Sequence, residues 1–174
     1  MESYLEEEMD LYTESGAVKA LSTESLNEPI KSLNLIPATL ISSATTVAEA
    51  VKIMQDKNFG ALLVSDKNKL TGIITERDIL RKVAGKNLEA SKVTVNQIMT
   101  ANPEALEMSD QILYAMNLMV VGGYRHVPIV DDKRKPISIL SIRDIVKHLS
   151  QFFEAEIQNL PPKPLRENQD REGA

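Results

Sequence analysis

Two hydrophobic periodicities alternate along the chain, and each predicts a different kind of element. Apolar residues at the i, i+3, i+4, i+7 spacing of a half-buried helix are Val47, Ala50, Val51 and Met54. Thr46 and Glu49 have the spacing of a capping box at the start of this helix. A β-prone stretch at 39–41 precedes the helix, and a continuous apolar run at 61–64 predicts a buried strand after it.

A hairpin and a second helix complete this first unit. The polar turn at 66–69 joins the first strand to a second strand expected at 70–75. A helix is then predicted from Glu76 to about Gly85, because a glycine commonly ends a helix. The first unit is therefore predicted to have the order β-α-β-β-α.

The same order of elements returns in the second half of the chain. A shift of 65 places residues 38–54 on 103–119, and a shift of 66 places residues 61–81 on 127–147. We expect the one-residue slip to fall in the loop before the strand. The second copy is expected to have a helix at 110–121, a strand at 127–131, a turn at 131–135, a strand at 136–140 and a helix at 142–150. This duplication predicts an α/β fold of two tandem β-α-β-β-α repeats.

The repeats divide the chain into five segments. These are an acidic N-terminal segment at 1–34, a first repeat at 35–85, a polar linker at 86–97, a second repeat at 98–153 and a C-terminal tail at 154–174. A short helical turn is expected at 97–100. The tail contains Pro161, Pro162 and Pro164, so we expect it to be extended or disordered.

Composition excludes several classes of function. The chain of 174 residues has no cysteine and two histidines, so neither a disulfide framework nor a metal site is expected. No apolar run approaches the roughly 18 residues of a membrane span. A net charge of −5 argues against nucleic acid as the main partner. The acidic N-terminus does not resemble a secretory signal, so a cytoplasmic location is expected.

The most informative motif is the junction between a strand and the following helix, which occurs twice as GIITERD at 72–78 and SILSIRD at 138–144. A hydroxyl residue three positions before an acid is the pattern of a helix-capping box. The same residues also suit a nucleotide, because a hydroxyl and an arginine contact phosphate and an aspartate accepts bonds from a ribose diol. The residues concerned are Thr75, Arg77 and Asp78 in one copy, and Ser141, Arg143 and Asp144 in the other. The residues alone leave both interpretations open.

These two motifs, the RHVPIVDD segment at 125–132 and the repeat length resemble a tandem pair of CBS domains, also called a Bateman module, over residues 35–153. The resemblance implies two repeats packed about a pseudo-twofold axis, with two clefts for an adenine nucleotide such as AMP, ADP, ATP, NAD or S-adenosylmethionine. It implies that Thr75 and Asp78 serve one cleft, and Ser141 and Asp144 the other. Residues expected to border the base are Ile41, Ala61, Leu106, Val127 and Pro128, and Thr39 is also expected to contact the ligand.

The two copies differ in ways that predict unequal clefts. Gly72 in repeat 1, where a ligand or the backbone can approach closely, is replaced by Ser138 in repeat 2. Repeat 2 also has Arg125 and His126, which can meet a phosphate, where repeat 1 has an uncharged segment. One ligand per chain is therefore expected, with either cleft as its location.

The chain contains none of the common enzyme motifs, including a P-loop, a nucleophile elbow or a zinc-protease helix. We therefore predict a non-enzymatic regulatory module that binds an adenine nucleotide and signals to a separate protein. The resemblance also implies a homodimer. The alternative is a ligand-free interaction scaffold in which both motifs serve only as helix caps.

Overall fold

The computed structural model describes residues 27–153 of the chain. Residues 22–146 belong to one compact unit, which contains nearly all of both repeats, and the described residues 147–153 belong to a second unit. In the second unit, the rings of His148 and Phe152 meet edge to face with their centroids 5.6 Å apart. The predicted tail at 154–174 and most of the acidic N-terminal segment lie outside the described residues.

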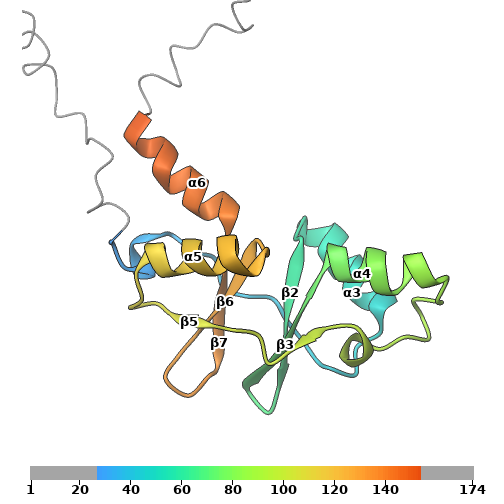
Figure 1. The fold of residues 1–174 in the computed structure, drawn as a ribbon. Coiled ribbons are helices and arrows are strands. Elements are labelled where there is room, and N and C mark those ends of the chain that lie inside the picture. Colours follow the sequence, from blue (N-terminus) through green and yellow to red (C-terminus); the bar gives the residue numbers. More distant parts are fainter. Residues whose placement is uncertain (1–26, 154–174) are drawn as a thin grey trace, which may run out of the picture. The chain divides into compact units, whose positions relative to one another are not determined.

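The first repeat forms a small sheet with two helices (Figure 1). Its elements are β1 (Leu40–Ile41), α3 (Val47–Lys57), β2 (Ala61–Asp66), β3 (Lys69–Thr75) and α4 (Glu76–Lys82). Strand β1 runs parallel to β2, β2 pairs antiparallel with β3, and β4 (Thr100–Ala101) adds a fourth strand next to β3. The predicted capping box at Thr46 and Glu49 is present at the start of α3.

The second repeat has the same topology. Its elements are β5 (Leu106–Glu107), α5 (Ile112–Gly122), β6 (His126–Val130), β7 (Pro136–Ser141) and α6 (Ile142–Ser150). Strand β5 is parallel to β6, and β6 is antiparallel to β7. The predicted fold of two β-α-β-β-α repeats is therefore confirmed. No helix of the described residues is long and apolar enough to cross a membrane.

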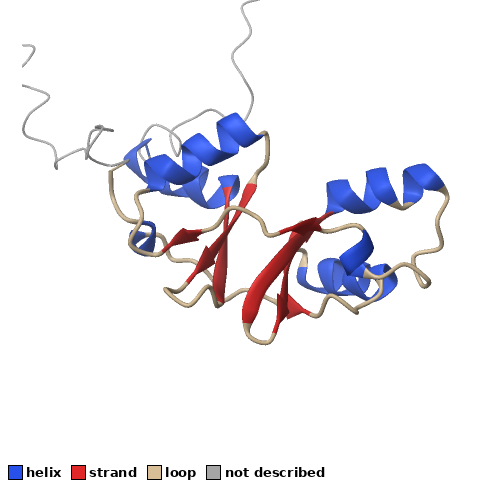
Figure 2. Cartoon of the chain, turned by 60° about the horizontal axis from the view of Figure 1, so that its bottom comes forward, coloured by secondary structure: helices blue, strands red, loops and turns tan. Residues whose placement is uncertain are grey.

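The two repeats exchange backbone hydrogen bonds reciprocally, which produces their pseudo-twofold relation. The segment before β1 reaches the second repeat, where Ala38 N donates to Ile137 O at 2.9 Å. The segment before β5 reaches the first repeat, where Asn102 N donates to Thr71 O at 2.9 Å. The strands of the two sheets accordingly lie side by side in both views (Figures 1 and 2).

The segment expected to be a polar linker contributes to the core of the first repeat. Val93, Val95 and Ile98 are buried in the same hydrophobic cluster as Val47. Val47 N donates to Val93 O at 2.9 Å, which holds the segment against the start of α3. The short helical turn lies at Val95–Gln97, so the prediction of 97–100 was wrong. The Gln97 side chain accepts a hydrogen bond from Thr94 N at 2.9 Å. This contact stabilises the start of the turn, which therefore begins earlier than expected.

Strand pairing also corrects the alignment of the two copies. Ala61 lies opposite Thr75, and His126 lies opposite Ser141, so His126 and not Val127 is the counterpart of Ala61. The extra residue is therefore in the second hairpin turn, and the expected position in the loop before the strand was wrong. Both strand segments are apolar, so a pattern of residue classes matches equally well after a slip of one.

Helix α4 is shorter than predicted. It ends at Lys82, and a separate 3-10 turn follows at Ala84–Lys86. Between them Val83 is buried in the core of the first repeat, and its φ of −116° departs from helical geometry. The expected end near Gly85 therefore combined two elements.

Candidate functional site

Two cavities of similar size lie between the repeats. Cavity 1 has a volume of about 490 Å³ and cavity 2 of about 430 Å³, within the usual range of small-molecule sites. Cavity 1 is formed by residues 35–39 and 58–61 of repeat 1 with residues 141–144 of repeat 2. Cavity 2 is formed by residues 102–104 and 122–126 of repeat 2 with residues 75–78 of repeat 1. Each cavity thus combines the strand starts of one repeat with the junction motif of the other.

Four residues form a wall shared by the two cavities: Gly60, Glu76, Arg125 and His126. The backbone holds this wall in place, because Glu76 N donates to Gly60 O at 3.1 Å and Ile142 N donates to Arg125 O at 3.0 Å. A side chain at position 60 would lie 3.3 Å from the Glu76 carboxylate and 3.6 Å from the His126 ring. The glycine therefore lets these two side chains approach the boundary between the cavities.

Both junction motifs form complete capping boxes. Thr75 Oγ1 donates to Asp78 Oδ2 at 2.6 Å, Thr75 N donates to the same oxygen at 3.0 Å, and Asp78 N donates back to Thr75 Oγ1 at 3.3 Å. In the second copy, Ser141 Oγ and Ser141 N donate to Asp144 Oδ2 at 2.6 and 2.8 Å. The capping role is therefore real in both repeats, and each box faces a cavity.

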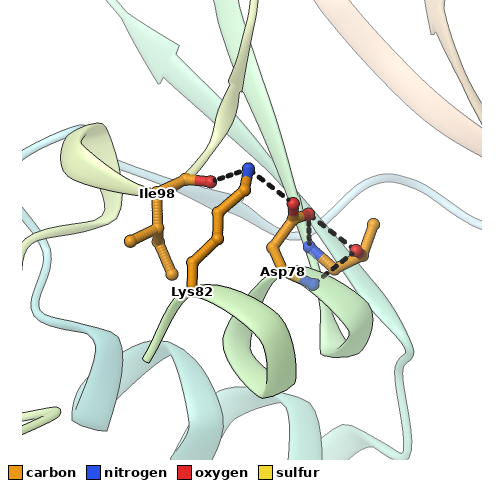
Figure 3. A network of polar contacts seen from close by, with 4 residues as sticks. Asp78, Lys82 and Ile98 are labelled. Atoms are coloured by element: carbon orange, nitrogen blue, oxygen red, sulfur yellow. Dashed lines mark hydrogen bonds and ion pairs between the residues drawn. The ribbon is translucent and has the colours of Figure 1, made fainter. Parts of the chain in front are cut away.

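The two aspartates differ in the partners of their second oxygen. Asp78 Oδ1 pairs with Lys82 Nζ at 2.8 Å, and the same ammonium donates to Ile98 O at 2.5 Å (Figure 3). Within residues 27–153, Asp144 makes no ion pair. Asp144 thus keeps an oxygen that accepts no hydrogen bond from the described protein, whereas both oxygens of Asp78 are engaged.

The arginines differ in the same way. Arg77 Nη1 donates to Gly123 O at 3.1 Å, at the end of α5. The guanidinium groups of Arg125 and Arg143 are exposed and form neither hydrogen bonds nor ion pairs with the part of the chain that the structure describes. Arg143 lines cavity 1, and Arg125 lies on the wall shared by both cavities, so within the described residues Arg143 is the free cation that distinguishes cavity 1.

Two side chains near the cavities have perturbed proton affinities. Burial, followed by the nearby Arg125 cation, lowers the pKa of His126, although Glu76 and Asp144 act in the opposite direction. Burial and a hydrogen bond to Glu104 raise the pKa of Tyr124 to about 12. The Tyr124 hydroxyl donates to Glu104 Oε2 at 2.9 Å, so a neutral phenol positions this carboxylate on cavity 2.

The structure brings most of the expected site residues together. Those on cavity 1 are Thr39, Ala61, Ser141, Arg143 and Asp144. Those on cavity 2 are Thr75, Arg77, Asp78 and Pro128. Arg125 and His126 belong to the shared wall.

Three expected contacts line neither cavity, which corrects the expectation that they border a base. Ile41 is buried in the core of repeat 1. Val127 is fully buried. Its neighbours His126 and Pro128 line a cavity, and successive strand residues face opposite sides of the sheet, so Val127 faces away from the cavities. Leu106 lies in β5, paired with Ile129. Gly72 also faces neither cavity: a Cβ there would collide with Met99 and lie 3.2 Å from Thr100 O, so this glycine allows close approach of the backbone.

Sequence reasoning did not identify Glu76 and Glu104 as cavity residues. Glu76 lies inside the first junction motif, and Glu104 corresponds to Thr39 under the shift of 65. That alignment already covers position 104, so giving Glu104 the role expected of Thr39 would have found it. Among the described residues, no group of three or more histidine, aspartate and glutamate side chains is arranged to hold a metal ion.

Comparison with known proteins gives a consistent result. The family model described as "CBS domain" matches residues 30–85 and 95–151. An uncharacterized 17.7 kDa protein of Acidianus ambivalens is 33% identical over 111 residues, which cover 63% of this chain and 66% of that protein. The CBS domain-containing protein CBSX3, mitochondrial, of Arabidopsis thaliana is 37% identical over 120 residues, which cover 66% of this chain and 58% of that protein. The chain therefore spans about two thirds or less of these curated relatives.

A solved structure has the same architecture and contains adenosine derivatives. It is the CBS domain pair of protein MJ0100 in complex with 5′-methylthioadenosine and S-adenosyl-L-methionine. The two structures agree with a TM-score of 0.64 at 29% identity, covering 70% of this chain and 99% of that one.

Proposed function

The chain belongs to the CBS domain family as a tandem pair, and we propose that it is a regulatory module that binds an adenine nucleotide between its repeats. The observation that carries this proposal is the placement of both junction motifs on cavities of about 490 and 430 Å³. Each motif supplies a carboxylate, a hydroxyl and an arginine within one turn of chain, which are the groups that a ribose and a phosphate require. The adenosine derivatives in the MJ0100 complex support the same ligand class.

The proposed module is a sensor and not an enzyme. Its cavities contain carboxylates engaged in capping boxes, and the family is typically non-catalytic. Binding would alter the relation of the two repeats, because each cavity contains residues of both. A separate protein would read this change, which requires the ligand to bind one arrangement better than the other.

Thermal unfolding of nucleotide-stripped protein tests the proposal. The candidates are AMP, ADP, ATP, NAD and S-adenosylmethionine, each at about 1 mM. A ligand present at about 100 times its dissociation constant adds roughly 2.7 kcal/mol of stability, which raises Tm by several degrees in a chain of this size. The expected result is a selective shift. If none of the five ligands shifts Tm in folded, stripped protein, the nucleotide-binding proposal is wrong.

A second candidate function is a ligand-free interaction scaffold, and one observation favours it. Both capping boxes are complete without any ligand, so helix capping alone accounts for the hydroxyl and acid of each motif. Capping does not account for the side chains of Arg143 and Arg125, which line cavity 1 and the shared wall and make no hydrogen bond or ion pair within the described residues. Loss of ligand binding in Arg143→Gln with unchanged Tm of the free protein would separate the two functions.

We also propose that the module acts as a homodimer. Helix α5 contains no charged residue, and a helix that is apolar on all sides is normally covered. Four of its apolar side chains are exposed: Leu113, Tyr114, Val120 and Val121. A second copy of the chain would cover this face. Sedimentation velocity at micromolar concentration should give the mass of a dimer.

The expected location is also part of this proposal. The expected location is the cytoplasm, whereas one Arabidopsis relative is named as mitochondrial. The location therefore stays a prediction, and fractionation of cells that express the full-length protein tests it.

A further inference from the structure

Although the two cavities are related by the repeat, they differ in which charged groups are available to a ligand. Because His126 is the counterpart of Ala61, the cavity-lining residues match one by one. Thr39, Phe59, Gly60 and Ala61 of cavity 1 correspond to Glu104, Tyr124, Arg125 and His126 of cavity 2. At the first of these positions, cavity 1 has the Thr39 hydroxyl and cavity 2 has the Glu104 carboxylate.

We infer that cavity 1 alone is the site for an adenosine nucleotide with a 5′-phosphate, and that Glu104 and Lys82 keep cavity 2 from taking the same ligand. This inference rests on the proposed function and deepens it, because it names the cavity and the ligand class. Three independent contacts of the described residues support it.

The first contact concerns the acceptor for ribose. Asp144 Oδ2 accepts from Ser141 at 2.6 Å, and its other oxygen has no partner among the described residues. Both oxygens of Asp78 are engaged, one by Thr75 at 2.6 Å and the other by Lys82 at 2.8 Å. A diol bound in cavity 2 would have to compete with the Lys82 ammonium, which the Ile98 carbonyl also holds. Cavity 1 offers its acceptor without this competition.

The second contact concerns the cation for phosphate. Arg77 of cavity 2 donates to the Gly123 carbonyl at 3.1 Å, so a phosphate there would have to displace a hydrogen bond. Its counterpart Arg143 makes no hydrogen bond or ion pair in the described part of the chain and faces cavity 1, whereas Arg125 lies on the wall shared by both cavities and does not distinguish them. A guanidinium group binds phosphate through paired hydrogen bonds, and the N–H donors of Arg143 are available for them.

The third contact concerns the sign of the neighbouring charge. Lys57 Nζ donates to Thr39 Oγ1 at 3.1 Å, which brings a cation to the edge of cavity 1. The corresponding edge of cavity 2 has the Glu104 carboxylate, fixed by the Tyr124 hydroxyl at 2.9 Å. Because like charges repel at close range, Glu104 disfavours a phosphate in cavity 2.

Isothermal titration of the full-length, stripped protein with AMP tests this inference. The expected stoichiometry is one AMP per chain. Asp144→Asn and Arg143→Gln should each weaken AMP binding by about 10- to 100-fold, since each removes a hydrogen bond to a charged group. The matched variants Asp78→Asn and Arg77→Gln change the same residue types in cavity 2, so each should weaken AMP binding at least about threefold less than its counterpart in cavity 1.

A gain-of-site variant guards against losses that arise from poor folding. In Glu104→Thr/Lys82→Met, cavity 2 loses its repelling carboxylate and Asp78 loses its cation. The expected stoichiometry is two AMP per chain, with the first affinity unchanged.

Each other outcome counts against the inference in a distinguishable way. Loss of AMP binding in Asp78→Asn with normal binding in Asp144→Asn would place the site in cavity 2 and leave the proposed function intact. Two equal sites in the wild type would overturn the selectivity of cavity 1. Binding of S-adenosylmethionine without AMP would overturn the ligand class alone. Absence of binding by AMP and by the other four adenine ligands would overturn the proposed function itself.

Discussion

Removal of the hydroxyl from one capping box should destabilise the protein by a measurable amount. Thr75 Oγ1 accepts from Asp78 N at 3.3 Å and donates to Asp78 Oδ2 at 2.6 Å. Thr75→Ala therefore leaves one amide at the start of α4 without its cap and removes one donor from a carboxylate. Loss of such a cap costs about 1 kcal/mol, within a range of about 0.5–2 kcal/mol. In a chain of this length, 1 kcal/mol lowers Tm by roughly 2–4 °C.

The partner variant Asp78→Ala should cost somewhat more. It removes the same capping box together with the ion pair to Lys82, whose side chain is 39% exposed. An ion pair with so exposed a partner contributes only about 0.5 kcal/mol or less. The expected loss is therefore about 1.5 kcal/mol. Thr75→Ser is the matched control, because it keeps the hydroxyl and should stay within about 0.5 kcal/mol of wild type.

Urea unfolding followed by circular dichroism measures these losses, and the double variant supplies the decisive comparison. Thr75 and Asp78 bond to each other, so Thr75→Ala/Asp78→Ala should cost about 1 kcal/mol less than the sum of the single variants. Additive losses would mean that the two side chains do not stabilise α4 together. Ser141 and Asp144 have the same geometry, so they would not be expected to stabilise α6 together either.

Three further predictions concern other parts of the structure. The lowered pKa of His126 means that the unfolded chain takes up a proton more readily than the folded one, so the free energy of unfolding should fall as pH drops through about 6.5. His126→Gln should make the free energy of unfolding less dependent on pH in urea titrations between pH 7.5 and 5.5. Gly72→Ala should lower Tm in a thermal melt, because the Met99 side chain would have to move aside and the added Cβ would lie 3.2 Å from Thr100 O. Val121 is 79% exposed, and Val121→Lys should convert the dimer to monomers in sedimentation velocity while Tm of the monomer stays unchanged. A dimer that persists in this variant would place the interface elsewhere.

The order of elements could be predicted from sequence because each local signal agreed with the next. The apolar spacing of α3, its Thr46 cap and the polar turn before β3 all act within a few residues. Because the chain is duplicated, the second repeat shows the same pattern of apolar and polar positions. The capping boxes were visible for the same reason, since a hydroxyl and an acid three positions apart need no distant partner.

The features that the sequence did not reveal depend on contacts between distant segments. Strand β4 forms because Thr100 and Ala101 pair with Gly72 and Ile73 of the other repeat. Val93 and Val95 belong to a segment of polar appearance, yet backbone bonds to the start of α3 bury them. Neither contact produces a periodicity within its own segment, so pattern analysis could not find it.

The cavities show the same limit most clearly at the two junctions. Thr75–Asp78 and Ser141–Asp144 have matching residue types and the same capping geometry, so a motif correctly predicts where both carboxylates lie. It does not predict which carboxylate is available to a ligand. The ammonium that occupies Asp78 is held by the Ile98 carbonyl, which follows the segment expected to be a linker. Access of a ligand to a duplicated carboxylate is therefore set by neighbours outside the motif. Functional roles assigned from one repeat to the other therefore have to be tested cavity by cavity.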